Sequence, residues 1–155
     1  MSTPPLGSSK DQLDTPALCV DLDALESNVR TMVTACRQHD VAWRPHAKCH
    51  KSPEIAHRLI AAGACGITCA KLGEAEVMAV AGIRGILIAN MIVGPQKLAR
   101  LVELCRRAEP IVCLDHIDQA EPLSQAMAAA GQSVRTIIEI DVGLQRVGCA
   151  PGEST

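Results

Sequence analysis

The sequence is almost devoid of aromatic side chains: its 155 residues include one tryptophan, Trp43, and neither phenylalanine nor tyrosine. Proteins that bind single-stranded nucleic acid stack bases on aromatic rings, so nucleic-acid binding is not expected. The formal net charge of −2 gives no electrostatic reason for binding to nucleic acid or to an anionic membrane surface. The core must therefore be built from aliphatic side chains, methionine and cysteine.

Long apolar runs and export signals are also lacking. No apolar run approaches the roughly 20 residues that a membrane-spanning helix needs. The first ten residues are rich in serine and proline and lack the apolar segment of a secretory signal, so residues 1–13 are expected to form a flexible arm. We therefore expect a cytoplasmic protein whose eight cysteines stay reduced.

The cysteines follow no metal-binding pattern. The sequence contains no Cys-x-x-Cys motif, and Cys65 and Cys69, the closest pair, would need two further ligands at suitable spacing to hold zinc. We interpret the cysteines as small hydrophobic side chains of the core, and no metal site is predicted.

What is present is an alternation of short aliphatic runs with longer segments of helical spacing. Extended segments are expected at 17–20, 41–46, 66–70, 85–90, 110–114 and 134–142. Helices are expected at 23–38, 52–62, 72–81, 95–108 and 117–130. Asp23, with Glu26 three residues later, has the spacing of a capping box, and Ser52 precedes Pro53 at the first position of a helix.

Apolar strands that alternate with helices predict an α/β fold with a parallel sheet covered on its faces. The Gly-x-Gly-x-x-Gly turn of a dinucleotide-binding sheet is absent. Polar residues instead follow the strands, where a (β/α)8 TIM barrel carries its chemistry: His46, Lys48, Lys71, Asn90, Asp115, His116, Asp141 and Arg146. A complete barrel needs roughly 250 residues. The chain is therefore interpreted as a partial barrel of about the first five βα units, or as a smaller open sheet.

The segment Arg44–Lys51 gathers five basic or imidazole side chains. A lysine among positive charges gives up its proton more readily. A neutral lysine amine is the form that makes a Schiff base with an aldehyde cofactor or a carbonyl substrate. Taken alone, the segment is somewhat more typical of a basic loop that binds solvent or a stray phosphate.

Five motifs, spread along nearly the whole chain, favour the reactive interpretation of that lysine. They are Asp14–Leu25, Arg44–Lys51, Gly66–Ala75, Ile86–Pro95 and Glu139–Gly148. Together they resemble fold-type III pyridoxal-phosphate enzymes of the alanine-racemase type. Within that group the chain is most similar to the family of D-threonine aldolase, D-serine dehydratase and 3-hydroxy-D-aspartate aldolase.

The resemblance implies roles for three residues. Lys48 would hold pyridoxal 5'-phosphate as a Schiff base and later move the substrate proton. Arg146 would contact the 3-oxygen of the cofactor, where a guanidinium stabilises negative charge, with a surface salt bridge as the alternative. His46 lies near the cofactor or is a hydrogen-bonded imidazole of the core.

Three further residues are weaker candidates for the substrate pocket. Lys71 lines the pocket or begins a solvated helix. Asn90 reaches the active site or caps the following loop. Asp141 orients Arg146 or lies in the mouth of the barrel. The remaining histidines near these motifs are expected to be solvated: His39, His50 and His57.

The resemblance implies a lyase of D-3-hydroxy amino acids, of the aldolase kind that yields glycine and an aldehyde. A D-serine dehydratase-like enzyme, a racemase and a non-catalytic cofactor-binding fragment are the alternatives. In the family, loops late in the barrel hold the cofactor phosphate and a C-terminal β domain holds a divalent metal. Residues 14–155 contain neither region and are interpreted as the N-terminal part of the barrel domain. The expected partner is a D-amino acid, with a homodimer or a complementing second polypeptide as alternative assemblies.

Overall fold

The strands of this chain are parallel and alternate with helices. The computed structural model describes residues 4–152 and contains one sheet of four strands in the order β1-β2-β3-β4. The strands are β1 (Ile67–Cys69), β2 (Ile86–Met91), β3 (Ile111–Leu114) and β4 (Arg135–Ile138). The helices between and before them are α2 (Pro53–Ala61), α3 (Leu72–Val80), α4 (Pro95–Cys105) and α5 (Ile117–Ala129). All strands therefore end at the same edge of the sheet, as an α/β barrel requires.

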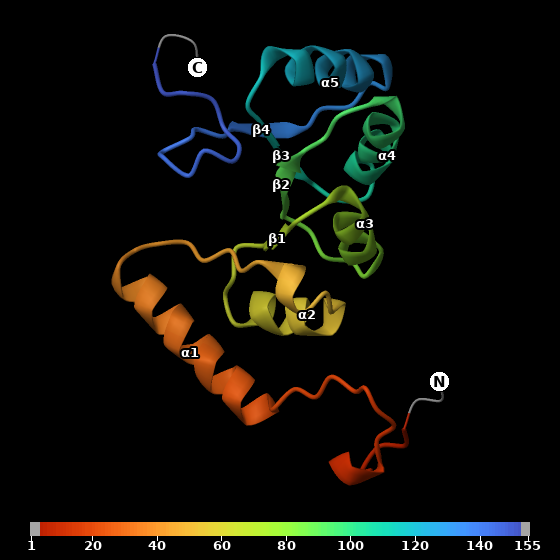
Figure 1. Cartoon of the computed structure of the whole chain (residues 1–155), viewed down its shortest axis with the longest axis vertical. Coiled ribbons are helices and arrows are strands. Elements are labelled where there is room, and N and C mark those ends of the chain that lie inside the picture. The colour runs from red at the N-terminus through yellow and green to blue at the C-terminus, as the bar shows by residue number, and fades with distance from the viewer. Residues whose placement is uncertain (1–3, 153–155) are drawn as a thin grey trace.

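The core lies between the sheet and the helices that follow one another along it. Figure 1 shows α3 and α4 on one side of the strands, with the C-terminal segment on the other side. The side chains that fill this layer come from both elements, and those with less than 2% exposure include Ile67, Met78, Ile86, Ile88, Leu101 and Val112. Aliphatic residues, methionine and cysteine thus fill the core, as the scarcity of aromatic residues requires.

The last strand is exposed, although its sequence predicts a buried one. Every residue of β4 is exposed, including Ile137 at 44% and Ile138 at 59%. The strand is also shorter than the expected 134–142 and is followed by a single bridge between Ile140 and Cys149. Within residues 4–152, β4 is an edge strand paired only with β3, so its apolar side chains have few neighbours.

The extended segment expected at 41–46 does not form a regular strand. The segment is nevertheless extended beside β1: Trp43 O accepts a hydrogen bond from Cys65 N at 2.9 Å, and Pro45 O accepts one from Thr68 N at 2.8 Å. A single bridge joins His46 to Thr68. Pro45 has no N–H to donate, which limits this edge to irregular pairing.

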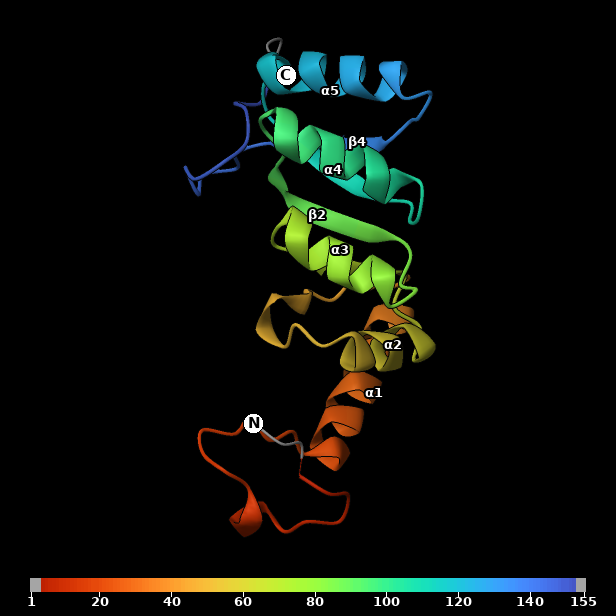
Figure 2. The same cartoon turned by 90° about the vertical axis from the view of Figure 1, so that its right-hand side faces the viewer.

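The N-cap of the first helix, α1 (Leu22–Gln38), lies two residues earlier than its capping pattern predicts. Asp21, not Asp23, is the N-cap, because its Oδ1 accepts a hydrogen bond from Ala24 N at 3.0 Å. No residue of α1 is buried, and Figures 1 and 2 show the helix projecting away from the sheet below α2. An ion pair of 3.4 Å between Arg58 and Glu26 connects α1 to α2.

The residues before α1 are, like those of α1, exposed to solvent. The expected extended run at 17–20 forms no strand, and Leu18 is 88% exposed. Residues 4–13 contain one short 3-10 helix, η1 (Lys10–Gln12). No helix within residues 4–152 is both long and apolar enough to cross a membrane.

The cysteines are less uniformly buried than predicted. Cys69 in β1 and Cys113 in β3 are buried, whereas three others are exposed: Cys19, Cys49 and Cys65. The two buried cysteines lie in strands covered by helices, whereas the exposed ones lie before α1, in a short 3-10 helix and before β1. Burial, then the charge of nearby Glu74, raises the pKa of the Cys69 thiol to about 12. All eight thiols are free.

Candidate active site

Lys48 lies in a short 3-10 helix that directly follows the extended segment beside β1. This element, η2 (Ala47–Cys49), begins at His46, whose Nδ1 accepts a hydrogen bond from the backbone N–H of Lys48 at 3.2 Å. Ala47 is only 2% exposed and packs η2 against β1. The Lys48 side chain is exposed and makes no hydrogen bond or ion pair with the described residues. The backbone is thus anchored while the amine is accessible.

His46 acts in this turn as a neutral imidazole. Burial and the positive charge of Lys48 lower its pKa below the usual 6.5, although the Glu74 carboxylate and a backbone hydrogen bond at Thr68 oppose the shift. A ring nitrogen that accepts a hydrogen bond must carry a lone pair, which agrees with the neutral form. The imidazole of His46 is thus hydrogen-bonded and orients the turn that carries Lys48.

Glu74 belongs to this cluster, and reasoning from the sequence gave it no role in the site. Its Oε2 accepts a hydrogen bond from Ala70 N at 2.8 Å, and its Oε1 lies 3.5 Å from Lys51 Nζ. The side chain is only 12% exposed. Glu74, in the first turn of α3, therefore connects this helix to the residue after β1, Ala70, and to Lys51, which follows η2. Its position three residues after Lys71, the N-cap of α3, is the sequence signal that points to this role.

Two of the weaker candidates, Lys71 and Asn90, lie at one pocket. It has a volume of about 420 Å³ and is lined by Lys71, Leu72, Gly73, Asn90, Met91, Ile92, Lys97 and Arg100. Asn90 Nδ2 donates to Ala70 O at 3.1 Å, and Asn90 Oδ1 accepts from Met91 N at 2.9 Å. Lys71 also lines a neighbouring pocket of about 380 Å³ beside Glu74 and Lys51. The structure brings these two residues together at the carboxyl end of β1 and β2.

Asp141 and Arg146 share a loop that follows β4. Asp141 Oδ1 accepts hydrogen bonds from Gly143 N at 2.8 Å and from Gln145 N at 3.0 Å. The bond from Gln145, then that from Gly143, lowers the pKa of the Asp141 carboxyl. Arg146 is exposed and makes no hydrogen bond or ion pair with the described residues. Asp141 therefore organises the backbone that leads to Arg146 and does not contact its guanidinium.

Lys48 and Arg146 lie at the same end of the sheet but at opposite edges of it. Lys48 follows the segment next to β1, and Arg146 follows β4, with β2 and β3 between them. No hydrogen bond or ion pair joins the two among residues 4–152.

The expectation of solvated histidines is wrong for His50. Its ring is half-buried, Nδ1 accepts from Ser52 N at 3.0 Å, and Nε2 is buried without a hydrogen-bond partner. This burial lowers the pKa of His50. His39 and His57 are exposed, as predicted. Across the described part of the chain, no three histidine, cysteine or acidic residues are grouped to hold a metal ion.

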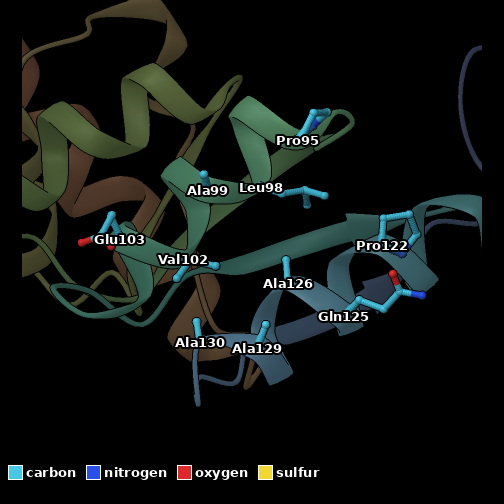
Figure 3. Close-up of a pocket in the computed structure, with 10 residues that line it drawn as sticks. All are labelled: Pro95, Leu98, Ala99, Val102, Glu103, Pro122, Gln125, Ala126, Ala129 and Ala130. Carbon is cyan, nitrogen blue, oxygen red and sulfur yellow. The ribbon is translucent and has the colours of Figure 1, made fainter.

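Another pocket, of about 590 Å³, lies between α4 and α5 and contains none of the predicted site residues (Figure 3). Its lining is mostly apolar: Pro95, Leu98, Ala99, Val102, Glu103, Pro122, Gln125, Ala126, Ala129 and Ala130. These residues belong to the helix layer, whereas the strand-end residues lie at the rim of the sheet. We therefore place the candidate site at the rim.

Comparison with known proteins agrees with a partial α/β barrel fold. Residues 20–155 match the family described as alanine racemase, N-terminal domain. The chain is 47% identical over 142 residues to a D-threonine aldolase of an Arthrobacter species, covering 92% of this chain and 38% of that protein. It is 34% identical over 150 residues to a 3-hydroxy-D-aspartate aldolase of Paracoccus denitrificans, covering 96% and 39%.

Solved structures give the same picture. The crystal structure of D-threonine aldolase from Filomicrobium marinum superposes with a TM-score of 0.88 at 50% identity, covering 91% of this chain and 38% of that one. D-threo-3-hydroxyaspartate dehydratase from a Delftia species superposes with a TM-score of 0.82 at 35% identity, covering 88% and 36%. The chain thus spans less than two fifths of the length of these relatives, and its sheet corresponds to part of their fold.

Proposed function

This chain belongs to the alanine racemase N-terminal domain family, and from that premise we propose that the whole protein is a pyridoxal-phosphate-dependent lyase of D-3-hydroxy amino acids. The observation that carries the proposal is the accessible, unpaired amine of Lys48 on an anchored turn at the carboxyl end of the sheet. The names of the relatives support the substrate class, because they are aldolases and a dehydratase of such amino acids.

The side chains present fit an aldehyde cofactor that carries an acidic ring hydroxyl. Lys48 offers a primary amine without an internal partner, and Arg146 offers a guanidinium without one, as judged over residues 4–152. Buried Ala47 and the hydrogen bond to His46 hold the backbone of Lys48 in place. A reactive amine on a fixed backbone is what covalent attachment of such a cofactor requires.

Bound pyridoxal phosphate supplies an aldehyde for covalent attachment and an electron-poor ring that accepts electrons released from the α-carbon of the substrate. In our proposal Lys48 Nζ would be the attachment atom and the group that moves a proton at that carbon. Arg146 would bind the ring 3-oxygen and stabilise its negative charge. His46 stays neutral and orients the turn of Lys48. Lys71 and Asn90 border the pocket in which the substrate would lie. Asp141 would contribute from the loop that carries Arg146, whose backbone it holds.

Cleavage of the bond between the α- and β-carbons is the reaction we favour, because the most similar of the relatives named above are aldolases. A dehydratase is the second candidate, favoured by the 35% identity to D-threo-3-hydroxyaspartate dehydratase. The two reactions are distinguished by their products. Retro-aldol cleavage of D-threonine yields glycine and acetaldehyde, whereas dehydration and deamination yield 2-oxobutanoate and ammonia.

Attachment of the cofactor is the first test. The chain is mixed with pyridoxal phosphate, reduced with borohydride, and mapped by mass spectrometry. Lys51→Ala is a matched control, because Lys51 is an exposed lysine of the same segment, with 63% of its side chain accessible. We expect modification at Lys48 in the parent and in Lys51→Ala, and its loss in Lys48→Ala. Unselective labelling of lysines, or equal labelling of Lys48→Ala at other positions, would mean that the chain is a non-catalytic fragment.

The remaining parts of the proposal concern the whole protein. We propose that the whole protein also binds a divalent metal through residues outside this chain, as in metal-dependent members of the family. We also propose a cytoplasmic location. The exposed edge strand β4 is where a second polypeptide or a second copy would pair. Mixing this chain with a polypeptide that carries the rest of the barrel tests complementation: activity that appears only on mixing supports it, and inactivity of the mixture contradicts it.

A further inference from the structure

Asp115 lies directly after β3, and both of its carboxylate oxygens accept hydrogen bonds. Oδ1 accepts from Gln119 Nε2 at 2.6 Å, and Oδ2 accepts from the backbone N–H of Gly148 at 2.9 Å. The backbone N–H of Asp115 donates to Gln119 Oε1 at 3.3 Å, so Gln119 holds the carboxylate from two sides. One acidic side chain therefore connects the end of β3 to a loop 33 positions further along the chain.

Residues 141–148 form the loop that Asp115 holds, and two backbone hydrogen bonds join the two ends of this loop. Cys149 N donates to Glu139 O at 2.9 Å, and Asp141 N donates to Cys149 O at 2.9 Å. Gly148 has a φ of +101°, and a Cβ there would lie 2.6 Å from Asp141 N. Only glycine permits this approach, which leaves the N–H of Gly148 free to reach Asp115.

Arg146 is two residues before Gly148 and has no partner of its own among residues 4–152. Its direction is therefore set by the loop backbone, which is held at one end by Asp141 and at the other by Asp115. A side chain that must meet a ligand needs a supported backbone, because a displacement of about 1 Å is enough to lose function.

We propose that Asp115 is a positioning residue for Arg146: its carboxylate fixes the loop 141–148 and so sets where the guanidinium lies. This inference rests on the proposed function for the role of Arg146, but the contact itself does not. An amide at position 115 would not substitute for the carboxylate. It offers one oxygen to two donors, Gln119 Nε2 and Gly148 N, and would direct its own N–H groups at one of them.

The first experiment needs no cofactor. Trypsin cleaves after Arg146 only when the loop opens, so the native cleavage rate at this bond reports how firmly the loop is held. We expect Asp115→Asn to raise that rate about tenfold, since a charge-assisted hydrogen bond is lost. Gln119→Ala should raise it less, because the bond to Gly148 stays. Asp118→Asn is the control: its side chain is 83% exposed and lies 3.4 Å from His116 Nδ1.

The second experiment asks whether Asp115 acts through Arg146. Pyridoxal-phosphate affinity is measured by absorption for the parent, Asp115→Asn, Arg146→Ala and the double variant. We expect Asp115→Asn to weaken binding in the parent and to have no further effect when Arg146 is already alanine. Unchanged cleavage after Arg146 in Asp115→Asn and Gln119→Ala would overturn the inference, as would equal losses of affinity in both backgrounds.

The two proposals fail in different ways. Absence of Lys48-dependent attachment in the parent would mean that the chain is a non-catalytic fragment, in which placing Arg146 serves no cofactor. The cleavage rates would still decide whether Asp115 holds the loop. Far-UV circular dichroism of each variant confirms that the comparison is made between folded chains.

Discussion

Glu74 offers a sharp test of how the end of β1 is joined to α3. Its carboxylate accepts a hydrogen bond from Ala70 N at 2.8 Å and lies 3.5 Å from Lys51 Nζ. A hydrogen bond to a charged acceptor contributes about 1.5–3 kcal/mol. The ion pair adds less than about 1 kcal/mol because Lys51 is largely exposed. Glu74→Ala should therefore lower the free energy of unfolding by about 2–4 kcal/mol.

Glutamine separates the two contributions. Glu74→Gln keeps an acceptor for Ala70 N but loses the charge, so we expect a loss of about 1–2 kcal/mol. Urea denaturation followed by far-UV circular dichroism measures both variants. Glu54→Ala is a matched control, because Glu54 also lies in the first turn of a helix and faces an arginine at 3.8 Å, but is 78% exposed. Its change should stay within about 1 kcal/mol, since only surface and helix-dipole effects are removed.

Two results would refute this reasoning about Glu74. Equal losses for Glu74→Ala and Glu54→Ala would show that the bond to Ala70 contributes nothing beyond a surface charge. A loss for Glu74→Gln as large as that for Glu74→Ala would show that the charge matters and the hydrogen bond does not.

Three further predictions follow from burial. Iodoacetamide followed by peptide mapping should modify Cys49 much faster than Cys69, whose thiol pKa is raised to about 12 by burial and by the charge of Glu74; equal rates would contradict this. The pKa values of His46 and His50 are lowered mainly by burial, so below pH 6.5 the unfolded chain binds more protons. The free energy of unfolding should therefore fall as the pH drops from about 7.5 to 5.5. It should fall less in the double variant His46→Gln, His50→Gln, as urea titrations at each pH would show. Leu101→Ala should cost about 2–5 kcal/mol in the same assay, because the side chain is fully buried in the core; a loss below 1 kcal/mol would contradict that packing.

The alternation of apolar runs and helical spacing was sufficient to predict the parallel α/β fold and most helix positions. Ser52 and Pro53 begin α2 as predicted, because capping depends only on neighbours within one turn. The same local logic misplaced the start of α1, where Asp21 and Asp23 both have a capping side chain and backbone geometry selects Asp21. Periodicity also could not show that the segment 41–46 pairs irregularly or that β4 is exposed, because burial depends on which elements cover a strand.

The candidate site likewise has features that the sequence predicts and features that only the folded chain shows. The sequence by itself determined that a lysine, Lys48, lies in a basic segment after a short apolar run, since residue type and neighbours along the chain are local properties. Only the tertiary structure decided that Glu74 reaches Lys51, and that Asp115 holds Gly148. These contacts join residues whose proximity depends on the register of parallel strands and on the close approach of Gly148 to Asp141. Neither is encoded in the spacing of residues along one segment, so the support of Arg146 is visible only in the folded chain.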